Sequence, residues 1–156
     1  MKIDLSTDKI VIYLKKDRVN VDFKDELRLE IFLKKLFICL NDYYDIEIKG
    51  YYDVCVYLDN IYGMVLVLKC EDYEFYDYFD KQVDMRIKIN KNKFLYKVDD
   101  LYCIDLNKYK IYKYLSDIYL LPKCKLNNIE LGKLIEISDI IYDSNEIMKK
   151  GVIINS

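Results

Sequence analysis

Residues 45–69 read DIEIKGYYDVCVYLDNIYGMVLVLK and contain the strongest strand signals in the chain. Every second residue from Val54 to Leu58 is aliphatic, which is the two-residue period of a half-buried strand. The continuous apolar run from Met64 to Leu68 is typical of a central strand that is covered on both faces. We therefore expect a short strand over residues 46–48, a break at Gly50, and then a β-hairpin that closes near residues 59–63.

The N-terminal residues predict a second hairpin followed by one helix. Residues 2–5 and 9–14 are its expected arms, joined by the turn Ser6-Thr7-Asp8. A helix is expected over residues 23–41, with Asp22 as its N-cap. Apolar residues recur at helical spacing within it, at Leu29, Phe32, Leu33, Leu36 and Leu40. One helix packed on one face of an antiparallel sheet satisfies this pattern.

The C-terminal residues again predict strands combined with a main helix. Strands are expected over residues 83–89, 94–98, 111–115, 118–121 and 152–154, with a turn over 90–93 and a short helix or loop from Asp99-Asp100 to Asn107. Pro122 should end the hairpin, because proline cannot donate to a strand ladder. The main helix should begin at Asn127 or Asn128 and carry Leu131, Leu134, Ile135 and Ile141. A last short helix should run from Ser144 to Gly151.

These patterns predict an α+β fold with two small halves, each made of mostly antiparallel strands and one main helix. We place the N-terminal half at residues 1–70, an acidic aromatic connector at 71–82 and the C-terminal half at 83–156. Charge divides along the same lines, since residues 71–84 carry six acidic groups and one basic group, whereas residues 85–156 carry nine acidic and thirteen basic groups. No concentrated basic face of the kind that binds nucleic acids is expected.

The chain contains no histidine, which excludes most common catalytic and metal-binding arrangements. Ser/His/Asp and Cys/His catalysis and histidine-containing metal sites all require that residue. Asp45, Glu47 and Lys49 resemble the acidic-x-lysine core of metal-dependent nucleases. In a strand, however, Glu47 and Lys49 share a face simply because successive side chains alternate. We therefore predict no catalytic residue, no cofactor and no metal.

The five cysteines are not paired in sequence and their number is odd, so we expect free thiols. Cys39 and Cys55 lie in apolar stretches and are expected to be small core residues. Free thiols, together with the expected lack of a signal peptide and of a membrane-spanning apolar run, predict a cytoplasmic protein.

Residues 70–81, CEDYEFYDYFDK, interleave five acidic residues with five aromatic ones. One interpretation is a connecting helix with one solvated face. The other is a docking segment, in which exposed tyrosines supply contact area and carboxylates steer the encounter. On the second interpretation, the predicted partner-binding residues are Tyr73, Tyr76 and Tyr78.

The order of elements and glycines resembles the MecA-type adaptor proteins, which present substrates to the Clp ATPase ClpC. The N-terminal part of the resemblance lies in Ile46, Ile48, Gly50, Val54, Val56, Gly63, Val65, Val67 and Lys69. The C-terminal part lies in Phe94, Tyr96, Asp99, Asp100, Ile104, Tyr112, Tyr119, Ile147, Gly151, Val152 and Ile153. The connector is shorter here than the long acidic linker of that family.

Two classes of function follow from the sequence. The resemblance implies a non-enzymatic adaptor or regulator in proteolysis, whose partners are proteins, namely a Clp ATPase and its substrates. The alternative is a small α+β enzyme or ligand-binding domain that uses carboxylate and lysine chemistry. Carboxylates and a lysine that converge in a pocket would favour the alternative. A broad exposed aromatic patch without such a pocket would favour the adaptor.

Overall fold

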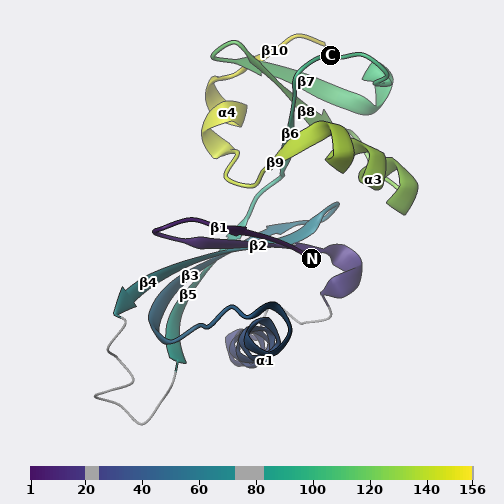
Figure 1. Ribbon diagram of the computed structural model, residues 1–156. Coiled ribbons are helices and arrows are strands. Elements are labelled where there is room, and N and C mark those ends of the chain that lie inside the picture. The colour runs from purple at the N-terminus through teal and green to yellow at the C-terminus, as the bar shows by residue number, and fades with distance from the viewer. Residues whose placement is uncertain (20–24, 73–82, 156) are drawn as a thin grey trace. The chain divides into compact units, whose positions relative to one another are not determined.

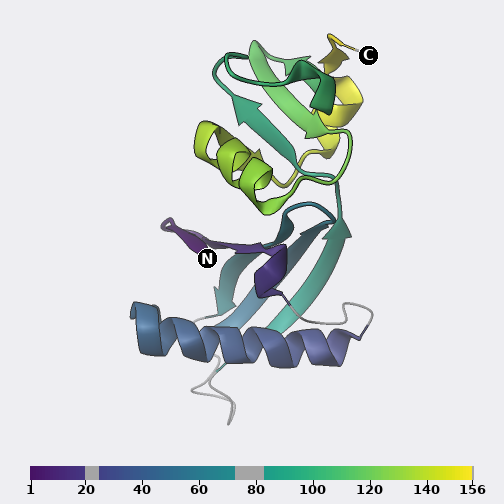
Figure 2. The same cartoon turned by 90° about the vertical axis from the view of Figure 1, so that its right-hand side faces the viewer.

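The computed structural model describes residues 1–19, 25–72 and 83–155, and these residues form two compact units (Figures 1 and 2). The first unit comprises Met1–Val56 and Met64–Asn90, and the second comprises Tyr57–Gly63 and Lys91–Ser156. Each unit contains a mostly antiparallel five-stranded sheet and a main helix, so the expected α+β class is confirmed.

The first sheet has the strand order β1-β2-β4-β3-β5. Its strands are β1 (Lys2–Leu5), β2 (Ile10–Lys15), β3 (Gly50–Asp59), β4 (Gly63–Asp72) and β5 (Val83–Lys91). The N-terminal hairpin is confirmed, with Lys2 opposite Tyr13. A short 3₁₀ turn, η1 (Lys16–Arg18), follows β2.

The hairpin expected from residues 45–69 is present and lies at the centre of this sheet. Along β3, buried and half-buried residues alternate from Gly50 to Val56. Along β4, every residue from Met64 to Leu68 is buried, as its central position between β2 and β3 requires. The prediction of a short strand over residues 46–48 is wrong. Asp45 adopts a left-handed conformation with φ 55°, which ends the preceding helix, and the chain reaches Gly50 without strand pairing.

Helix α1 (Glu26–Tyr44) lies along one side of the first sheet, as both views show (Figures 1 and 2). Its N-cap is Asp25 rather than the predicted Asp22, because the Asp25 carboxylate accepts hydrogen bonds from the backbone N–H groups of Leu27 and Arg28, at 3.1 and 3.3 Å. The buried stripe is also shifted from the prediction: Phe37 is buried, whereas Phe32 and Leu36 are only half-buried. Its fully buried members are Leu29, Leu33, Phe37 and Leu40.

The second sheet has the order β10-β7-β8-β6-β9. Its strands are β6 (Leu95–Val98), β7 (Tyr109–Tyr114), β8 (Asp117–Pro122), β9 (Ser138–Ile141) and β10 (Val152–Ile153). The hairpin between β7 and β8 turns through Leu115 and Ser116, which both have positive φ angles, and Pro122 is the last residue of β8 as expected. The loop before β7 contains a 3₁₀ turn, η2 (Leu106–Lys108), whose N-cap is Asp105.

Helices α3 (Asn128–Ile137) and α4 (Asn145–Lys150) lie on opposite sides of the second sheet (Figures 1 and 2). Asn127 is the N-cap of α3, and its side chain accepts a hydrogen bond from the Glu130 N–H at 2.8 Å. The prediction that α3 extends to Ile141 is wrong, because residues 138–141 form β9, which pairs with β6. Ser144 precedes α4 as expected, yet its hydroxyl donates to the carbonyl of Lys93 and does not cap the helix.

The tip of the β3–β4 hairpin belongs to the second unit. The Asp59 carboxylate accepts hydrogen bonds from the backbone N–H groups of Ile61 and Tyr62, at 2.9 and 2.8 Å, and from that of Phe94 at 3.0 Å. The rings of Tyr62 and Phe94 lie 6.0 Å apart. One carboxylate therefore joins the hairpin turn to the residue that precedes β6.

The units divide the chain differently from the sequence-based halves. Residues 83–91 were assigned to the C-terminal half, but they form β5 of the first sheet. Residues 57–63 were assigned to the N-terminal half, but they belong to the second unit.

Within the described residues, no helix is both long enough and apolar enough to cross a membrane. All five cysteines are free thiols, although Cys39 and Cys55 are half-buried rather than core residues.

Candidate protein-binding surface

The predicted partner-binding residues Tyr73, Tyr76 and Tyr78 lie outside the described residues, and the acidic aromatic segment is described only as far as Asp72. The prediction for these tyrosines therefore stays a prediction.

The nuclease-like residues do not form a metal site in the structure. Asp45 ends α1, and the Glu47 carboxylate is paired with the Lys49 ammonium group. No group of three or more cysteines, aspartates and glutamates is placed to hold a metal ion anywhere in residues 1–19, 25–72 and 83–155. The spacing of this motif came only from alternation along an expected strand, and that strand is absent.

The C-terminal edge of the second sheet is the most exposed apolar part of its strands. We call residues 152–154 the edge segment. They comprise β10 and the residue after it, and β10 pairs antiparallel with β7, with Val152 opposite Lys113 and Ile153 opposite Tyr112. The side chains of Val152, Ile153 and Ile154 are 65%, 45% and 49% exposed. Edge strands are commonly protected by charged residues or proline, and this segment has neither.

Gly151 fixes where the edge segment begins. Its N–H donates to the carbonyl of Ile147 at 2.7 Å and so closes the end of α4. A Cβ atom at this position would lie 2.5 Å from that carbonyl oxygen and 3.5 Å from the carbonyl oxygen of Lys113. The φ angle of Gly151 is −69°, so it is the close backbone approach that calls for glycine here.

Asn155 fixes where the edge segment ends. The N–H of Ile154 donates to the carbonyl of Ile111 at 2.9 Å, and the next rungs are supplied by the Asn155 side chain. Its Oδ1 accepts from the Ile111 N–H at 2.7 Å, and its Nδ2 donates to the carbonyls of Tyr109 and Leu106 at 2.9 and 3.3 Å. The Asn155 side chain thus ties this part of the chain to the loop between Asp105 and Tyr109.

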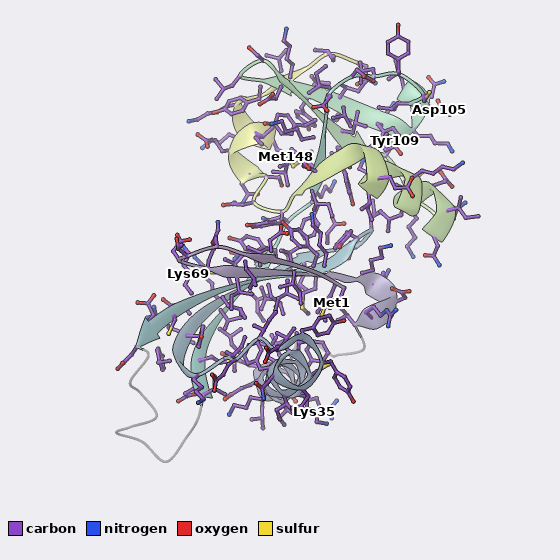
Figure 3. The ribbon with its side chains drawn as sticks, viewed as in Figure 1. Met1, Lys35, Lys69, Asp105, Tyr109 and Met148 are labelled. Carbon is purple, nitrogen blue, oxygen red and sulfur yellow. The ribbon has the colours of Figure 1, made fainter. Side chains whose placement is uncertain are left out.

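Packing beneath the edge segment holds it in place. Leu95, Tyr112, Tyr119 and Leu121 form a buried cluster of the second sheet. Ile147 and Met148 of α4 pack against this cluster. Figure 3 labels Met148 on this helix. On the loop side, Lys108 and Glu130 form an ion pair at 2.9 Å, which raises the pKa of Lys108 and lowers that of Glu130. The edge segment is therefore packed on a folded part of the second unit and is not a free tail.

The charges around the edge segment are mostly positive. Lys110 and Lys113 lie on the neighbouring strand β7, and Lys149 and Lys150 form the last turn of α4. Lys150 is paired with Glu146 at 3.0 Å, which raises the pKa of Lys150. The segment thus combines apolar side chains with a surplus of positive charge.

A second feature of the same unit is an acidic hollow of about 420 Å³ beside β6 and β9. Its polar lining includes Lys97, Asp99, Asp100, Tyr102, Glu136 and Asp139. Lys97 lies opposite Asp139 in the β6–β9 register and pairs with Asp117 at 3.6 Å. The sequence predicts Asp99 and Asp100 at the start of a short helix or loop and includes them in the resemblance to MecA-type adaptors. It does not predict that they line a hollow, because the position of β9 beside them depends on long-range pairing.

The sequence indicated a final strand at residues 152–154 but not its exposure. Three consecutive apolar residues after a glycine are compatible with either a buried or an exposed strand, and only the sheet order distinguishes the two. Nothing in the sequence pointed to Asn155. No protein-family model, curated protein or solved structure matches this chain.

Proposed function

We propose that this protein is a non-enzymatic adaptor that acts by binding other proteins. The observation that carries the proposal is the edge segment, an unprotected apolar strand edge on a firmly packed support. Such edges are recognised by the addition of a partner strand, in which backbone hydrogen bonds supply affinity and alternate side chains supply specificity.

The resemblance of the sequence to MecA-type adaptors supports a role in proteolysis and directs the first test to a Clp ATPase. The full chain should bind purified ClpC with a dissociation constant that isothermal titration calorimetry can measure. A chain that carries Val152→Glu and Ile154→Glu should bind at least roughly tenfold more weakly, because it places charge where apolar contact is expected.

A chain that carries Leu27→Glu and Ile38→Glu provides the matched control. Leu27 and Ile38 lie on α1 and are 66% and 62% exposed, against 65% and 49% for Val152 and Ile154, so the control adds the same two charges at accessible sites. Circular dichroism should show that both variants are folded. If ClpC binds neither the parent nor the variants, the Clp ATPase is not the partner. If the edge variant binds as tightly as the control, the adaptor uses another surface.

The same assay tests the acidic aromatic segment. The combined change Tyr73→Ala, Tyr76→Ala and Tyr78→Ala should weaken partner binding while the circular dichroism spectrum is retained. Added salt should weaken binding further if the carboxylates of this segment steer the encounter. Loss of the folded spectrum would make these rings structural, and unchanged binding would make the segment a connector only.

The acidic hollow favours a second candidate function, the binding of a cationic ligand. Four carboxylates line it, and a ligand with several amino groups would complement them. Titration with spermine, followed by ¹⁵N–¹H spectra, should shift the amides of residues 97–102 and 136–139. The shifts should diminish in Asp139→Asn, and uniform small shifts over the whole chain would instead indicate nonspecific charge binding.

A further inference from the structure

We propose that the edge segment accepts an extended acidic segment of a partner protein as a sixth strand of the second sheet. The inference rests on the proposed function and names the chemistry of the partner at that surface. Three features of the edge segment carry it: the direction of its backbone groups, the exposure of its side chains on both faces, and the charge around it.

The backbone N–H and C=O groups of Ile153 point away from β7 and can pair with another strand. In a strand, the N–H and C=O groups of successive residues point to opposite sides. The N–H of Ile154 donates to Ile111 on β7, so the N–H and C=O groups of Ile153 point to the outer side. An added strand can therefore donate to and accept from Ile153 without disturbing the existing ladder.

The side chains of the edge segment are exposed on both faces of the sheet. Val152 and Ile154 point to one face and Ile153 to the other, because strand side chains alternate. All three are at least 45% exposed. A partner strand with an apolar residue beside them would cover area on each face, and this burial adds to the backbone hydrogen bonds.

The charge of the surroundings selects an acidic partner. Lys110 and Lys113 lie on the strand next to the edge segment, and Lys149 and Lys150 lie just before it in the chain. Within the part of the chain that the structure describes, Lys150 is the one lysine of these four that pairs with an acidic side chain, that of Glu146. Carboxylates on an incoming strand would meet this positive field, whereas lysines would be repelled.

The two ends of the edge segment limit the length of the added pairing. At Gly151 the chain turns into α4, and at Asn155 the side chain has replaced the backbone as the partner of β7. The pairing is therefore centred on Ile153, and the partner contributes a short acidic strand rather than a long one.

The probe is a short acetylated peptide of alternating glutamate and valine, titrated into the ¹⁵N-labelled full chain. We expect shifts of the amide signals of residues 110–113 and 152–155, with affinity that falls as salt is added. A peptide of alternating lysine and valine is the matched control and should bind at least roughly tenfold more weakly.

Two variants separate backbone pairing from side-chain contact. Ile153→Pro removes the outward N–H, and Ile153→Ala removes only the side chain, so the proline variant should lose more affinity for the glutamate peptide. A Lys113→Glu, Lys149→Glu chain should reverse the preference between the two peptides. Circular dichroism reports whether each variant is folded.

Equal binding of the acidic and basic peptides, or shifts confined to other residues, would overturn the inference. Equal affinities of the proline and alanine variants would also overturn it, since a strand cannot then be pairing with Ile153. If the peptide binds at the edge segment while ClpC does not bind the chain, the Clp ATPase is excluded as the partner and the inference about the edge segment stands.

Discussion

The Tyr96 hydroxyl is the one buried side-chain polar atom without a hydrogen-bond partner among residues 1–19, 25–72 and 83–155. Tyr96 is fully buried on β6, and its burial raises its pKa. A buried hydroxyl without a partner costs stability. We expect Tyr96→Phe to leave the free energy of unfolding unchanged or to raise it by up to about 1 kcal/mol, as measured by urea denaturation. A loss of more than about 1 kcal/mol would show that the hydroxyl is bonded.

Tyr62, at the tip of the β3–β4 hairpin, makes the free energy of unfolding depend on pH in the alkaline range. Burial raises the pKa of Tyr62 from 10.0 to about 12. The folded protein favours the protonated Tyr62 hydroxyl. The free energy of unfolding therefore does not change with this group below pH 10 and falls as pH rises from about 10 to 12, because the unfolded chain releases the proton first. The loss should reach roughly 2–3 kcal/mol, measured as urea midpoints across this range. Tyr62→Phe should flatten that part of the profile, and an unchanged profile would assign it to other groups.

We expect the change of glycine to alanine to have opposite effects on stability at Gly151 and at Gly132. A Cβ at Gly151 would clash with the Ile147 carbonyl, whereas nothing lies within 4 Å of a Cβ at Gly132 in α3. Gly151→Ala should therefore destabilise the protein by about 1–3 kcal/mol. Gly132→Ala should stabilise it by about 0.5–1 kcal/mol, since alanine is favoured within helices. Thermal unfolding of both variants provides the comparison, and effects of the same sign would contradict it.

At the scale of the element, α1 offers a matched pair of leucines. Leu33 is fully buried and Leu36 is half-buried. Leu33→Ala should cost roughly 2–5 kcal/mol, and Leu36→Ala clearly less, because only the first leaves a cavity in the core. Chemical denaturation of the two variants measures the difference. Equal losses would show that the sheet covers both sides of the stripe.

The local elements could be predicted from sequence where the pattern is strong. Alternation identified β3, the apolar run identified β4, and the polar turn identified the hairpin of β1 and β2. The predicted N-cap and buried stripe of α1 are shifted from the observed ones. Both Asp22 and Asp25 can act as N-caps, and the choice depends on which face of the helix meets the sheet. The short strand at residues 46–48 was wrong because alternation alone cannot supply a neighbour with which to pair.

At the scale of the whole molecule, strand partners could not be predicted. The pattern of β5 showed that it is a strand but not that it joins the first sheet, because a strand pattern describes its faces and not its edges. For the same reason the exposure of the edge segment and the acidic hollow beside β9 were not foreseen. Both depend on which strand ends the second sheet.

The exchange of segments between the units predicts that the chain cannot be divided at the acidic aromatic segment. A fragment of residues 1–70 lacks β5, so β3 becomes an unpaired edge. It should unfold at lower urea concentration than a fragment of residues 1–91, which restores β5. A fragment of residues 83–156 lacks Asp59, so the Phe94 N–H loses its acceptor. Equal midpoints for the two N-terminal fragments would contradict this division of the chain.

The late arrival of β5 also affects how the protein is made. β4 ends at Asp72, and β5 is complete only at Lys91. At translation rates of about 5–20 residues per second, the ribosome needs on the order of 1–4 s to add the intervening residues. Throughout that interval the nascent chain carries β3 without its outer neighbour, and the open strand edge can pair with other nascent chains. Slow translation between these two strands would lengthen the exposure, and rapid translation would shorten it.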